Sequence, residues 1–311
     1  MYPLKLEGAM KSKVWGGNDL KYYHKSSSEM QLGEVWELAC HPNGSSKIMN
    51  GELQGQSVCS LMNEENIRLL GKAYEAFPIM VKFLDAKSDL SLQVHPDDKY
   101  AKENYNGFGK TEVWYILSAD PGSEIILGSN SCSLEETMKS IENEDLRDCL
   151  NHVEVNAGEF YSVPAGTIHG IGKGIVLLEI QESSDLTFRL HDYGRGRELH
   201  LEEAEKVIKL SADFGKCRGF KEMKGNNEIT YFIQTSHFEV KRIKIRDCFT
   251  DEVNPNFQLI SCIGGTGYLT YRDQIFDVQT GDQYLIPANM GNFELRGMLD
   301  VIVTQPGTMK N

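Results

Sequence analysis

A histidine that follows a tight turn is the residue in this sequence best placed to do chemistry. Gly158–His169 reads Gly-Glu-Phe-Tyr-Ser-Val-Pro-Ala-Gly-Thr-Ile-His, which is typical of a strand that enters a Pro/Gly turn and delivers one imidazole into a β-barrel. A related pattern occurs at Gly281–Asn292, with five residues between the glycine and the proline in both copies. Asn292 stands where the first copy has His169. We therefore predict two similar β-units, of which only the first carries a metal ligand.

Three further residues are expected to share that interior. Gln93 and His95 lie two apart on a predicted strand, so alternation points both to one face. Glu112 begins the next predicted strand. Two imidazoles, one carboxylate and an amide oxygen suit a zinc-like divalent ion, with a position left for water or substrate. We predict one metal site formed by Gln93, His95, Glu112 and His169.

That prediction depends on the four residues occurring together. A single histidine on a strand is more often a hydrogen-bonded core residue than a ligand. Five other histidines lack the Pro/Gly turn and the repeated β pattern, and we interpret them as surface or core residues: His24, His41, His152, His200 and His237.

A polar segment after the predicted strand Ile175–Ile180 offers charged side chains. Arg189 is expected to face the pocket, where a fixed guanidinium would stabilise developing negative charge. The alternative is that Asp185, Arg189 and Arg195 form a solvated loop.

Two lysines extend this positive charge. Lys82 and Lys110 are also expected to lie beside the predicted site. Several cations next to a metal, in a chain of net charge −13, indicate a pocket for a phosphorylated or otherwise anionic substrate. We predict that Lys82 and Asp185 contact this substrate.

Composition narrows the class of protein. With 311 residues, 40% hydrophobic and 25% charged, the chain suits a globular protein of one large or two ordinary domains. Its negative charge argues against nucleic acid or an anionic membrane as the main partner. The N-terminus has no basic region before an apolar run, and no apolar stretch approaches the roughly 18 residues of a membrane span. We therefore expect a cytoplasmic protein that does not enter the membrane.

Other motifs exclude further classes. The seven cysteines are widely spaced and include no Cys-x-x-Cys, which predicts reduced thiols in place of disulfides or a zinc knuckle. No Walker loop, Gly-x-Gly-x-x-Gly turn or Gly-x-Ser-x-Gly elbow is present. Nucleotide hydrolysis, dinucleotide chemistry and serine hydrolysis therefore have no support.

Short strands dominate the chain and position these residues. Turns rich in Gly, Pro, Asn and Asp separate them, which predicts a sandwich, jelly roll or barrel. The predicted strands are Gly33–Cys40, Ile79–Leu84, Ser91–His95, Glu112–Leu117, Glu124–Leu127, Phe160–Val163, Ile175–Ile180, Thr230–Gln234, Phe238–Ile245, Phe257–Ile263, Gly267–Tyr271, Gln283–Ile286 and Val301–Thr304. Three helices are predicted to cover one barrel: Glu64–Phe77, a helix capped by Ser133 that runs to about Glu142, and His200–Leu210.

The polar stretch Lys221–Glu228 is the best candidate for a linker. It divides the chain into a predicted metal-binding unit, residues 1–224, and a predicted C-terminal unit without metal ligands, residues 225–311.

Four motifs in this order resemble class I mannose-6-phosphate isomerase. They are Gln-Val-His-Pro-Asp-Asp, Gly-Lys-Thr-Glu-Val-Trp-Tyr, Val-Pro-Ala-Gly-Thr-Ile-His and Ser-Ser-Asp-x-x-x-Arg. The segments around Trp15 and Glu34-Val-Trp36 are also similar to that family, and the length matches its short bacterial form. The resemblance runs from about Val14 to Tyr193, with a weaker cupin-like match at the C-terminus.

The resemblance implies two cupin-type jelly-roll barrels and a zinc-dependent enzyme that interconverts mannose 6-phosphate and fructose 6-phosphate. The family's metal ligands map onto Gln93, His95, Glu112 and His169, its essential arginine onto Arg189, and its active-site lysine onto Lys110, as read from the motifs. The broader cupin pattern has His-x-His and a shorter gap before the glutamate than the 16 residues found here. The isomerases share both departures.

Such an isomerase moves a proton between C2 of the aldose and C1 of the ketose through an enediolate, so a base must carry that proton. Lys110, Asp185 and His191 are the candidates. The alternatives are another metal-dependent cupin enzyme, such as an oxygenase, and a non-catalytic phosphosugar-binding cupin. The presence of Lys110, Asp185 and Arg189 beside the metal set favours catalysis. The sequence does not assign an oligomeric state.

Overall fold

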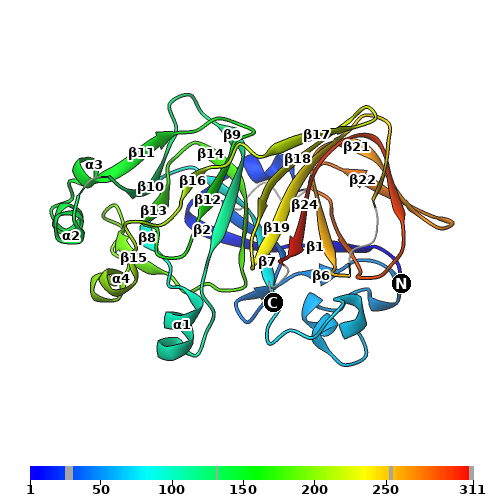
Figure 1. Cartoon of the computed structure of the whole chain (residues 1–311), viewed down its shortest axis with the longest axis horizontal. Coiled ribbons are helices and arrows are strands. Elements are labelled where there is room, and N and C mark those ends of the chain that lie inside the picture. The colour runs from blue at the N-terminus through cyan, green and yellow to red at the C-terminus, as the bar shows by residue number, and fades with distance from the viewer. Residues whose placement is uncertain (25–30, 131, 252–254, 308–311) are drawn as a thin grey trace.

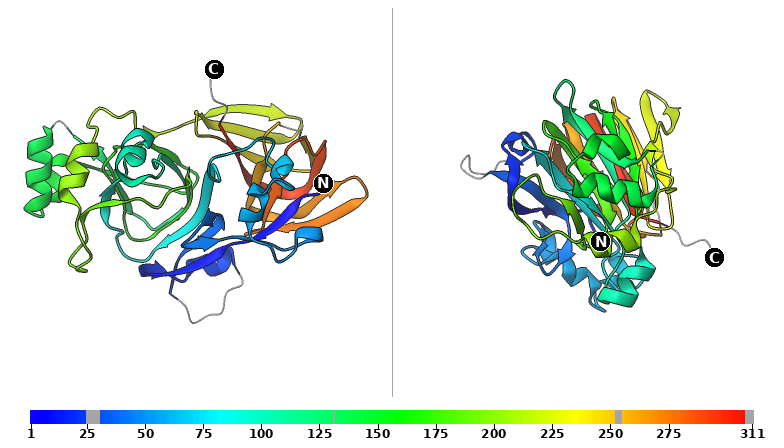
Figure 2. Two further views of the ribbon diagram at one scale, coloured as in Figure 1. Left: turned by 90° about the horizontal axis from the view of Figure 1, so that it is seen from below. Right: turned by 90° about the vertical axis from the view of Figure 1, so that its left-hand side faces the viewer.

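The chain folds into two β-units that lie side by side (Figure 1). The computed structural model describes residues 1–24, 31–130, 132–251 and 255–307. Strands make up most of the regular structure, which confirms the mainly β prediction. The helices α2 (Leu134–Glu142), α3 (Leu146–Cys149) and α4 (Leu201–Val207) gather at the end of the first unit that points away from the second (Figures 1 and 2).

The first unit consists of two facing sheets with antiparallel pairing. The seven-stranded sheet has the order β16 (Gly215–Lys216), β12 (Phe160–Val163), β9 (Glu112–Ala119), β14 (Ile175–Glu182), β7 (Ile79–Ala86), β2 (Ala9–Gly17) and β3 (Leu32–Leu38). The five-stranded sheet has the order β11 (Leu150–Glu154), β10 (Glu124–Ser129), β13 (His169–Ile171), β8 (Leu92–Val94) and β15 (Phe188–His191). A two-stranded hairpin, β4 (Cys40–His41) and β5 (Gly44–Ser45), follows β3.

Alternation along the central strands decides which side chains face the interior of the first unit. On β14, Val176 and Leu178 pack into the apolar cluster shared with the second unit, while Leu177 packs inside with Trp114 of β9. Glu179 follows two residues after Leu177, so it points into the same interior. The strand pattern therefore places charged residues at one end of an otherwise apolar interior.

The second unit is one ten-stranded sheet. Its main path is β17 (Phe220–Lys224), β18 (Asn227–Gln234), β19 (Phe238–Ile245), β24 (Phe293–Pro306), β21 (Gln258–Tyr271), β23 (Gln283–Ile286), β1 (Leu4–Glu7) and β6 (Lys47–Ile48), with β20 (Cys248–Asp251) on β24 and β22 (Gln274–Gln279) on β21. The strands β18 to β24 contribute to a single apolar cluster, so this part of the sheet must curl around it. Gly265 sits near the bend of β21 with φ +90°, and a Cβ there would lie 1.9 Å from the carbonyl oxygen of Met298.

The units share the largest apolar cluster of the described residues. It combines Phe83 and Leu178 of the seven-stranded sheet with Val240 and Leu259 of the ten-stranded sheet. Moreover, β1 and β6 come from the N-terminal part of the chain but pair within the second sheet. The predicted division after residue 224 separates the two parts along the sequence. In space, strands from the N-terminal part belong to the sheet of the second unit.

Two predictions about local structure were wrong. The segment Lys221–Glu228 is not a linker, because Lys224 pairs with Asn227 in the β17–β18 hairpin. Its polarity follows from exposure, since every residue of β17 is exposed. Glu64–Phe77 contains only the short 3-10 helix Ile67–Leu69 and turns. Gly71 stops any longer helix there, with φ +90° and the Pro255 carbonyl oxygen 2.0 Å from the position of a Cβ.

The capping-box helix was predicted correctly. The hydroxyl of Ser133 accepts from the Glu136 amide at 3.2 Å, and the Glu136 carboxylate accepts from the Ser133 amide at 2.7 Å. The α-helices are α1 (Asp98–Tyr105), α2 (Leu134–Glu142), α3 (Leu146–Cys149) and α4 (Leu201–Val207). The remaining 3-10 helices are Asp19–Tyr22, Gly51–Leu53 and Val58–Met62. In the part of the chain that the structure describes, no helix is long and apolar enough to cross a membrane.

The expectation of reduced thiols was wrong for four cysteines. Cys40 is bonded to Cys59, and Cys132 to Cys149. The partners are 19 and 17 residues apart, and only the folding of the intervening loops brings them together. Sequence spacing therefore carried no signal of these pairs. The other three cysteines are free thiols: Cys217, Cys248 and Cys262.

Candidate metal centre and its pocket

The four predicted ligands converge from both sheets of the first unit. On the five-stranded sheet, Gln93 of β8 lies directly opposite His169, the first residue of β13. His95 follows the end of β8 by one residue. Glu112 begins β9 on the facing sheet. His95, Glu112 and His169 are each only 1% exposed, so the centre lies inside the unit.

Their functional atoms meet at one point. Nε2 of His95 lies 3.5 Å from one oxygen of Glu112, and Nε2 of His169 lies 3.4 Å from the other. The amide nitrogen of Gln93 lies 3.4 Å and 3.2 Å from the same two imidazole nitrogens. A 180° turn of this amide exchanges its nitrogen for the oxygen that a metal requires.

Both imidazoles are held in the state that a metal ligand needs. Nδ1 of His95 lies 2.9 Å from the carbonyl oxygen of Leu186, and Nδ1 of His169 lies 2.9 Å from that of Thr167. A carbonyl only accepts, so each Nδ1 carries the proton and each Nε2 turns a lone pair inward. Burial lowers the pKa of both histidines, which keeps them neutral.

One carboxylate oxygen of Glu112 also indicates that these residues could hold a cation. Oε1 of Glu112 is buried and accepts no hydrogen bond among the described residues. Nε2 of His169 lies 3.4 Å from this oxygen and carries no proton in the tautomer above. A buried carboxylate oxygen that faces an imidazole lone pair is costly unless a cation lies between them. The donor set of Gln93, His95, Glu112 and His169 therefore fits a divalent metal ion of zinc type.

A chain of buried charges continues from this centre. The ammonium group of Lys110 lies 2.6 Å from Glu112, 3.0 Å from Nε2 of His95 and 4.0 Å from Glu179. Lys82 lies 3.2 Å from Glu179 on the neighbouring strand. Burial alone would lower the pKa of Lys110, but Glu112 and Glu179 outweigh it and raise that pKa. Burial opposes ionisation of Glu179, yet Lys110 and Lys82 lower its pKa, so the group holds alternating fixed charges.

One pocket of about 480 Å³ brings the remaining predicted residues together. Lys82, Lys110, Asp185 and Arg189 line it together with Gln93. Arg189 donates from Nη1 to the carbonyl of Glu198 at 2.7 Å, while its buried Nε has no partner within the described residues. The pocket is also lined by residues that the sequence analysis did not select as site residues: Lys11, Lys13, Glu34, Trp36, Asn43, Glu179, Thr187 and Arg197.

Comparisons with known proteins match both parts of the chain to one enzyme family. Residues 3–116 match the family described as phosphomannose isomerase type I, catalytic domain, and residues 228–306 match the mannose-6-phosphate isomerase cupin domain. The mannose-6-phosphate isomerase ManA of Bacillus subtilis is 36% identical over 310 residues, which cover 97% of this chain and 98% of that protein. The chain belongs to the type I phosphomannose isomerase family. This confirms the resemblance and the cupin fold.

Further relatives of this phosphomannose isomerase family cover almost the whole chain. The mannose-6-phosphate isomerase of Streptococcus mutans is 35% identical, with 97% of this chain and 98% of that protein covered. The crystal structure of the mannose 6-phosphate isomerase from Bacillus subtilis superposes with a TM-score of 0.93 at 34% identity, covering 98% of this chain and 99% of that one. A putative mannosephosphate isomerase from Archaeoglobus fulgidus shares the fold, with a TM-score of 0.79 at 20% identity and coverage of 99% and 98%.

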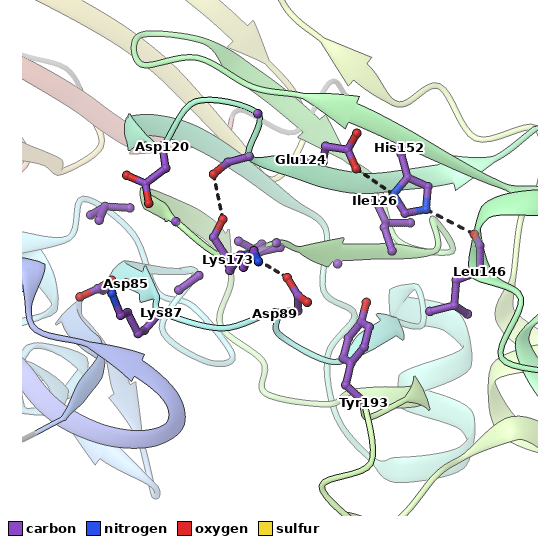
Figure 3. Close-up of a pocket in the computed structure, with 18 of the residues that line it drawn as sticks. Asp85, Lys87, Asp89, Asp120, Glu124, Ile126, Leu146, His152, Lys173 and Tyr193 are labelled. Carbon is purple, nitrogen blue, oxygen red and sulfur yellow. Dashed lines mark hydrogen bonds and ion pairs between the residues drawn. The ribbon is translucent and has the colours of Figure 1, made fainter.

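This member of the phosphomannose isomerase family also has a wider cavity, whose lining includes none of the four candidate ligands (Figure 3). It measures about 890 Å³ and mixes both signs of charge, for example Lys87, Asp89 and Lys173. His191 lines this cavity and not the pocket of the ligands, and its Nε2 lies 3.9 Å from Glu144. His191 is therefore withdrawn as a candidate base. Arg195 is likewise engaged elsewhere, because it donates to Asp192 and to the carbonyl of Asp89.

The sequence analysis did not select Glu179 or His41, and only Glu179 could have been recognised from the sequence. Glu179 interrupts the apolar run Ile175–Ile180, and a lone carboxylate in a buried strand calls for a buried cation as its partner. His41 left no such signal. It was interpreted as a surface or core residue, yet its Nε2 lies 3.4 Å from Asp185. No local pattern links residues so far apart in the sequence.

Proposed function

We propose that this chain interconverts mannose 6-phosphate and fructose 6-phosphate, using one zinc ion per chain. The observation that carries the proposal is the buried cluster of His95, Glu112 and His169. Gln93 and Lys110 contact this cluster and also line the pocket of Lys82 and Arg189. The names of the relatives supply the substrate, and a cytoplasmic location remains part of the proposal.

Gln93, His95, Glu112 and His169 would hold the metal. A bound zinc ion supplies Lewis-acid polarisation at an otherwise neutral pair of imidazoles. The protein contributes orientation, because the carbonyls of Leu186 and Thr167 fix both rings. Burial of the centre excludes bulk water, which strengthens every charge interaction inside it.

The cations of the pocket suit a phosphorylated hexose in its open-chain form. Arg189 has an uncommitted buried Nε, and a planar guanidinium of this kind stabilises an enediolate oxygen as negative charge develops. Lys82 is held against Glu179 and over the ring of Trp36, with its ammonium group 5.1 Å from the ring centre. We assign Lys82 and Asp185 to substrate binding at the pocket wall.

The proton transfer divides between two residues. Lys110 carries a raised pKa beside Glu112 and Glu179, so it enters the reaction protonated and donates a hydrogen bond or a proton to a substrate oxygen. Asp185 lines the same pocket as a carboxylate that no lysine or arginine contacts within the described residues. We therefore assign Asp185 as the base that moves the proton between C1 and C2.

A coupled isomerase assay tests the proposal. Protein stripped of metal is expected to be inactive, and one equivalent of zinc should restore conversion of mannose 6-phosphate. Binding of the phosphosugar without turnover, by the fully zinc-loaded protein, would support a non-catalytic sugar-binding protein instead. Activity that requires a redox-active metal and oxygen would support an oxygenase.

A further inference from the structure

The hairpin β4–β5 reaches across the pocket to the loop that carries Asp185. The side-chain amide of Asn43 donates to one carboxylate oxygen of Asp185 at 2.7 Å. Nε2 of His41 lies 3.4 Å from the other oxygen. Asn43 is 142 residues away from Asp185 in the sequence, so the fold alone creates this contact. One hairpin therefore contacts both oxygens of the carboxylate, one through a hydrogen bond and the other through the nearby imidazole.

The local geometry of the hairpin sets the tautomer of His41. The backbone amide of Asn43 donates to Nδ1 of His41 at 3.2 Å. An accepting Nδ1 has no proton, so in the neutral imidazole the proton sits on Nε2 and points to Asp185. Asn43 therefore donates to one oxygen of the carboxylate, and Nε2 of His41 faces the other. Each carboxylate oxygen keeps a further lone pair for a substrate hydroxyl.

The hairpin itself is anchored on several sides. The hydroxyl of Ser46 donates to the carbonyl of Trp36 at 3.0 Å and accepts from the amide of Ala39 at 2.9 Å. Cys40, next to His41, is bonded to Cys59. Lys11 donates to the carbonyl of Asn43. A support with this many attachments can hold a side chain in one place, whereas the Asp185 side chain alone is 43% exposed.

We propose that His41 and Asn43 are positioning residues, which hold the carboxylate of Asp185 in the orientation that the isomerisation needs. The inference rests on the proposed function, because it takes Asp185 as the group that moves the proton. Removal of either donor frees the carboxylate to rotate, and misplacement of a reacting group lowers the rate of the chemical step more than the affinity for substrate.

The test combines single and double variants in the zinc-loaded enzyme. His41→Ala and Asn43→Ala are each expected to lower kcat about tenfold and to change KM less than about twofold. Asp185→Asn should lower kcat further. The double variant His41→Ala/Asp185→Asn should be no slower than Asp185→Asn alone, since His41 acts only through Asp185.

His152 provides a matched control. Its side chain is 17% exposed and its Nδ1 lies 3.3 Å from Glu124, whereas the His41 side chain is 16% exposed and lies 3.4 Å from Asp185. His152 lines the wide cavity instead of the ligand pocket. His152→Ala should therefore leave kcat unchanged while removing a comparable histidine–carboxylate contact. His41→Gln, whose amide also donates, should recover part of the activity lost in His41→Ala.

The possible results distinguish failure of the proposed function from failure of the positioning role. If wild-type protein loaded with zinc shows no isomerase activity, the proposed function fails, and the positioning role fails with it. If wild-type protein is active but His41→Ala keeps full kcat, or multiplies the defect of Asp185→Asn, only the positioning role is overturned. If His41→Ala does not fold, as judged by circular dichroism and metal content, His41→Gln and Asn43→Ala decide by the same comparison with Asp185→Asn.

Discussion

The two β-units of this chain differ in what fills them. The first has buried charge at one end of its interior, with Lys82, Glu112 and Glu179 near the buried His95 and His169. The second is packed with aliphatic and aromatic side chains such as Ile260, Leu269, Tyr284 and Leu299. Burying charge costs stability unless the charges are paired, while burying apolar area contributes stability. The first unit therefore holds the buried charges that the proposed chemistry needs, and the second has an apolar core of its own.

The difference begins at a single turn. In the first unit the Pro/Gly turn ends with His169, which is 1% exposed. In the second unit Met290 is the buried residue after the turn, and Asn292 is exposed. The hydroxyl of Tyr271 donates to the carbonyl of Met290 at 2.7 Å and holds the turn in this arrangement. A similar turn can thus present a ligand or close an apolar interior.

The largest loss of activity is expected from substitutions at the metal centre proposed for the first unit. Glu112→Gln and His169→Ala should lose zinc and lower kcat/KM by more than about 100-fold, because changes outside the ligand shell already cost 10–100-fold. Elemental analysis and the coupled assay measure both quantities on the same sample.

The second unit supplies the control. Asn292→His should not create a second zinc site, because its neighbour Met290 and the cluster behind it offer apolar side chains. A stoichiometric second metal bound within residues 229–311 of either protein would contradict the difference between the units.

Substitution of one arginine in each unit should have different effects on activity and stability. Arg189 lines the ligand pocket, whereas Arg242 pairs with Asp300 in the second unit and lies over the ring of Tyr115. Arg189→Ala should lower kcat by about 10²–10³-fold, the scale for loss of one preorganised donor, with zinc content unchanged. Arg242→Ala should leave kcat unchanged and lower the melting temperature. Arg189→Lys should recover only part of the rate, since lysine lacks the planar guanidinium.

The outcome for Arg189 also tests its assigned role. A rise in KM alone, with kcat intact, would make Arg189 a substrate anchor and would remove it from the chemical step.

Structural features that depend on residues close together in the sequence were predicted well. The strand Phe160–Val163 is found at its predicted bounds, and the Pro/Gly turn after it delivers His169 to the ligand cluster. Alternation placed Gln93 and His95 in one interior. The capping box between Ser133 and Glu136 marked the start of α2. Each of these rests on residues within about a dozen positions of one another, where sequence spacing fixes geometry.

Residues that act through long-range contacts were not predictable in the same way. The pairing of Cys40 with Cys59, the insertion of β1 into the second sheet and the contact of His41 with Asp185 all depend on how distant segments pack. The hairpin at 221–228 was mistaken for a linker because an exposed edge strand has the composition of a loop. Residue types and spacing predicted the four candidate ligands, and the resemblance to a family mapped onto the same four, but neither indicated these supporting contacts.

A substitution in the apolar core of the second unit should lower stability without changing the rate of catalysis. Leu269 is fully buried in the second unit, and Leu269→Ala should lower the free energy of unfolding by about 2–5 kcal/mol. The zinc-loaded variant should keep wild-type kcat at temperatures where it stays folded, because no residue of its cluster lines the ligand pocket. Urea unfolding and the isomerase assay measure the two effects. A fall in kcat with folding intact would show that the second unit controls the geometry of the first.

The smallest expected effect concerns a contact that joins the units. His237, in the turn between β18 and β19, places Nδ1 3.0 Å from a carboxylate oxygen of Glu182 at the end of β14. The other oxygen of Glu182 accepts from the amide of Thr111 at 2.6 Å, next to Lys110. The hydrogen bond to Glu182 raises the pKa of His237 above 6.5, against a smaller opposing effect of burial. Stability from this pair is therefore present in full below pH 6.5 and is lost as the pH rises through the raised pKa.

His237→Gln should remove that dependence on pH. The free energy of unfolding of the wild type, minus that of the variant, should be greatest near pH 5.5 and should fall as the pH increases beyond 6.5. The decline should be modest, because the side chain of His237 is 32% exposed and water weakens the attraction. Urea titrations of both proteins at half-unit steps from pH 5.5 to 8.5 give the difference directly. A difference that stays constant across this range would show that His237 is neutral throughout, and the units would then be held together by their shared apolar cluster without this ion pair.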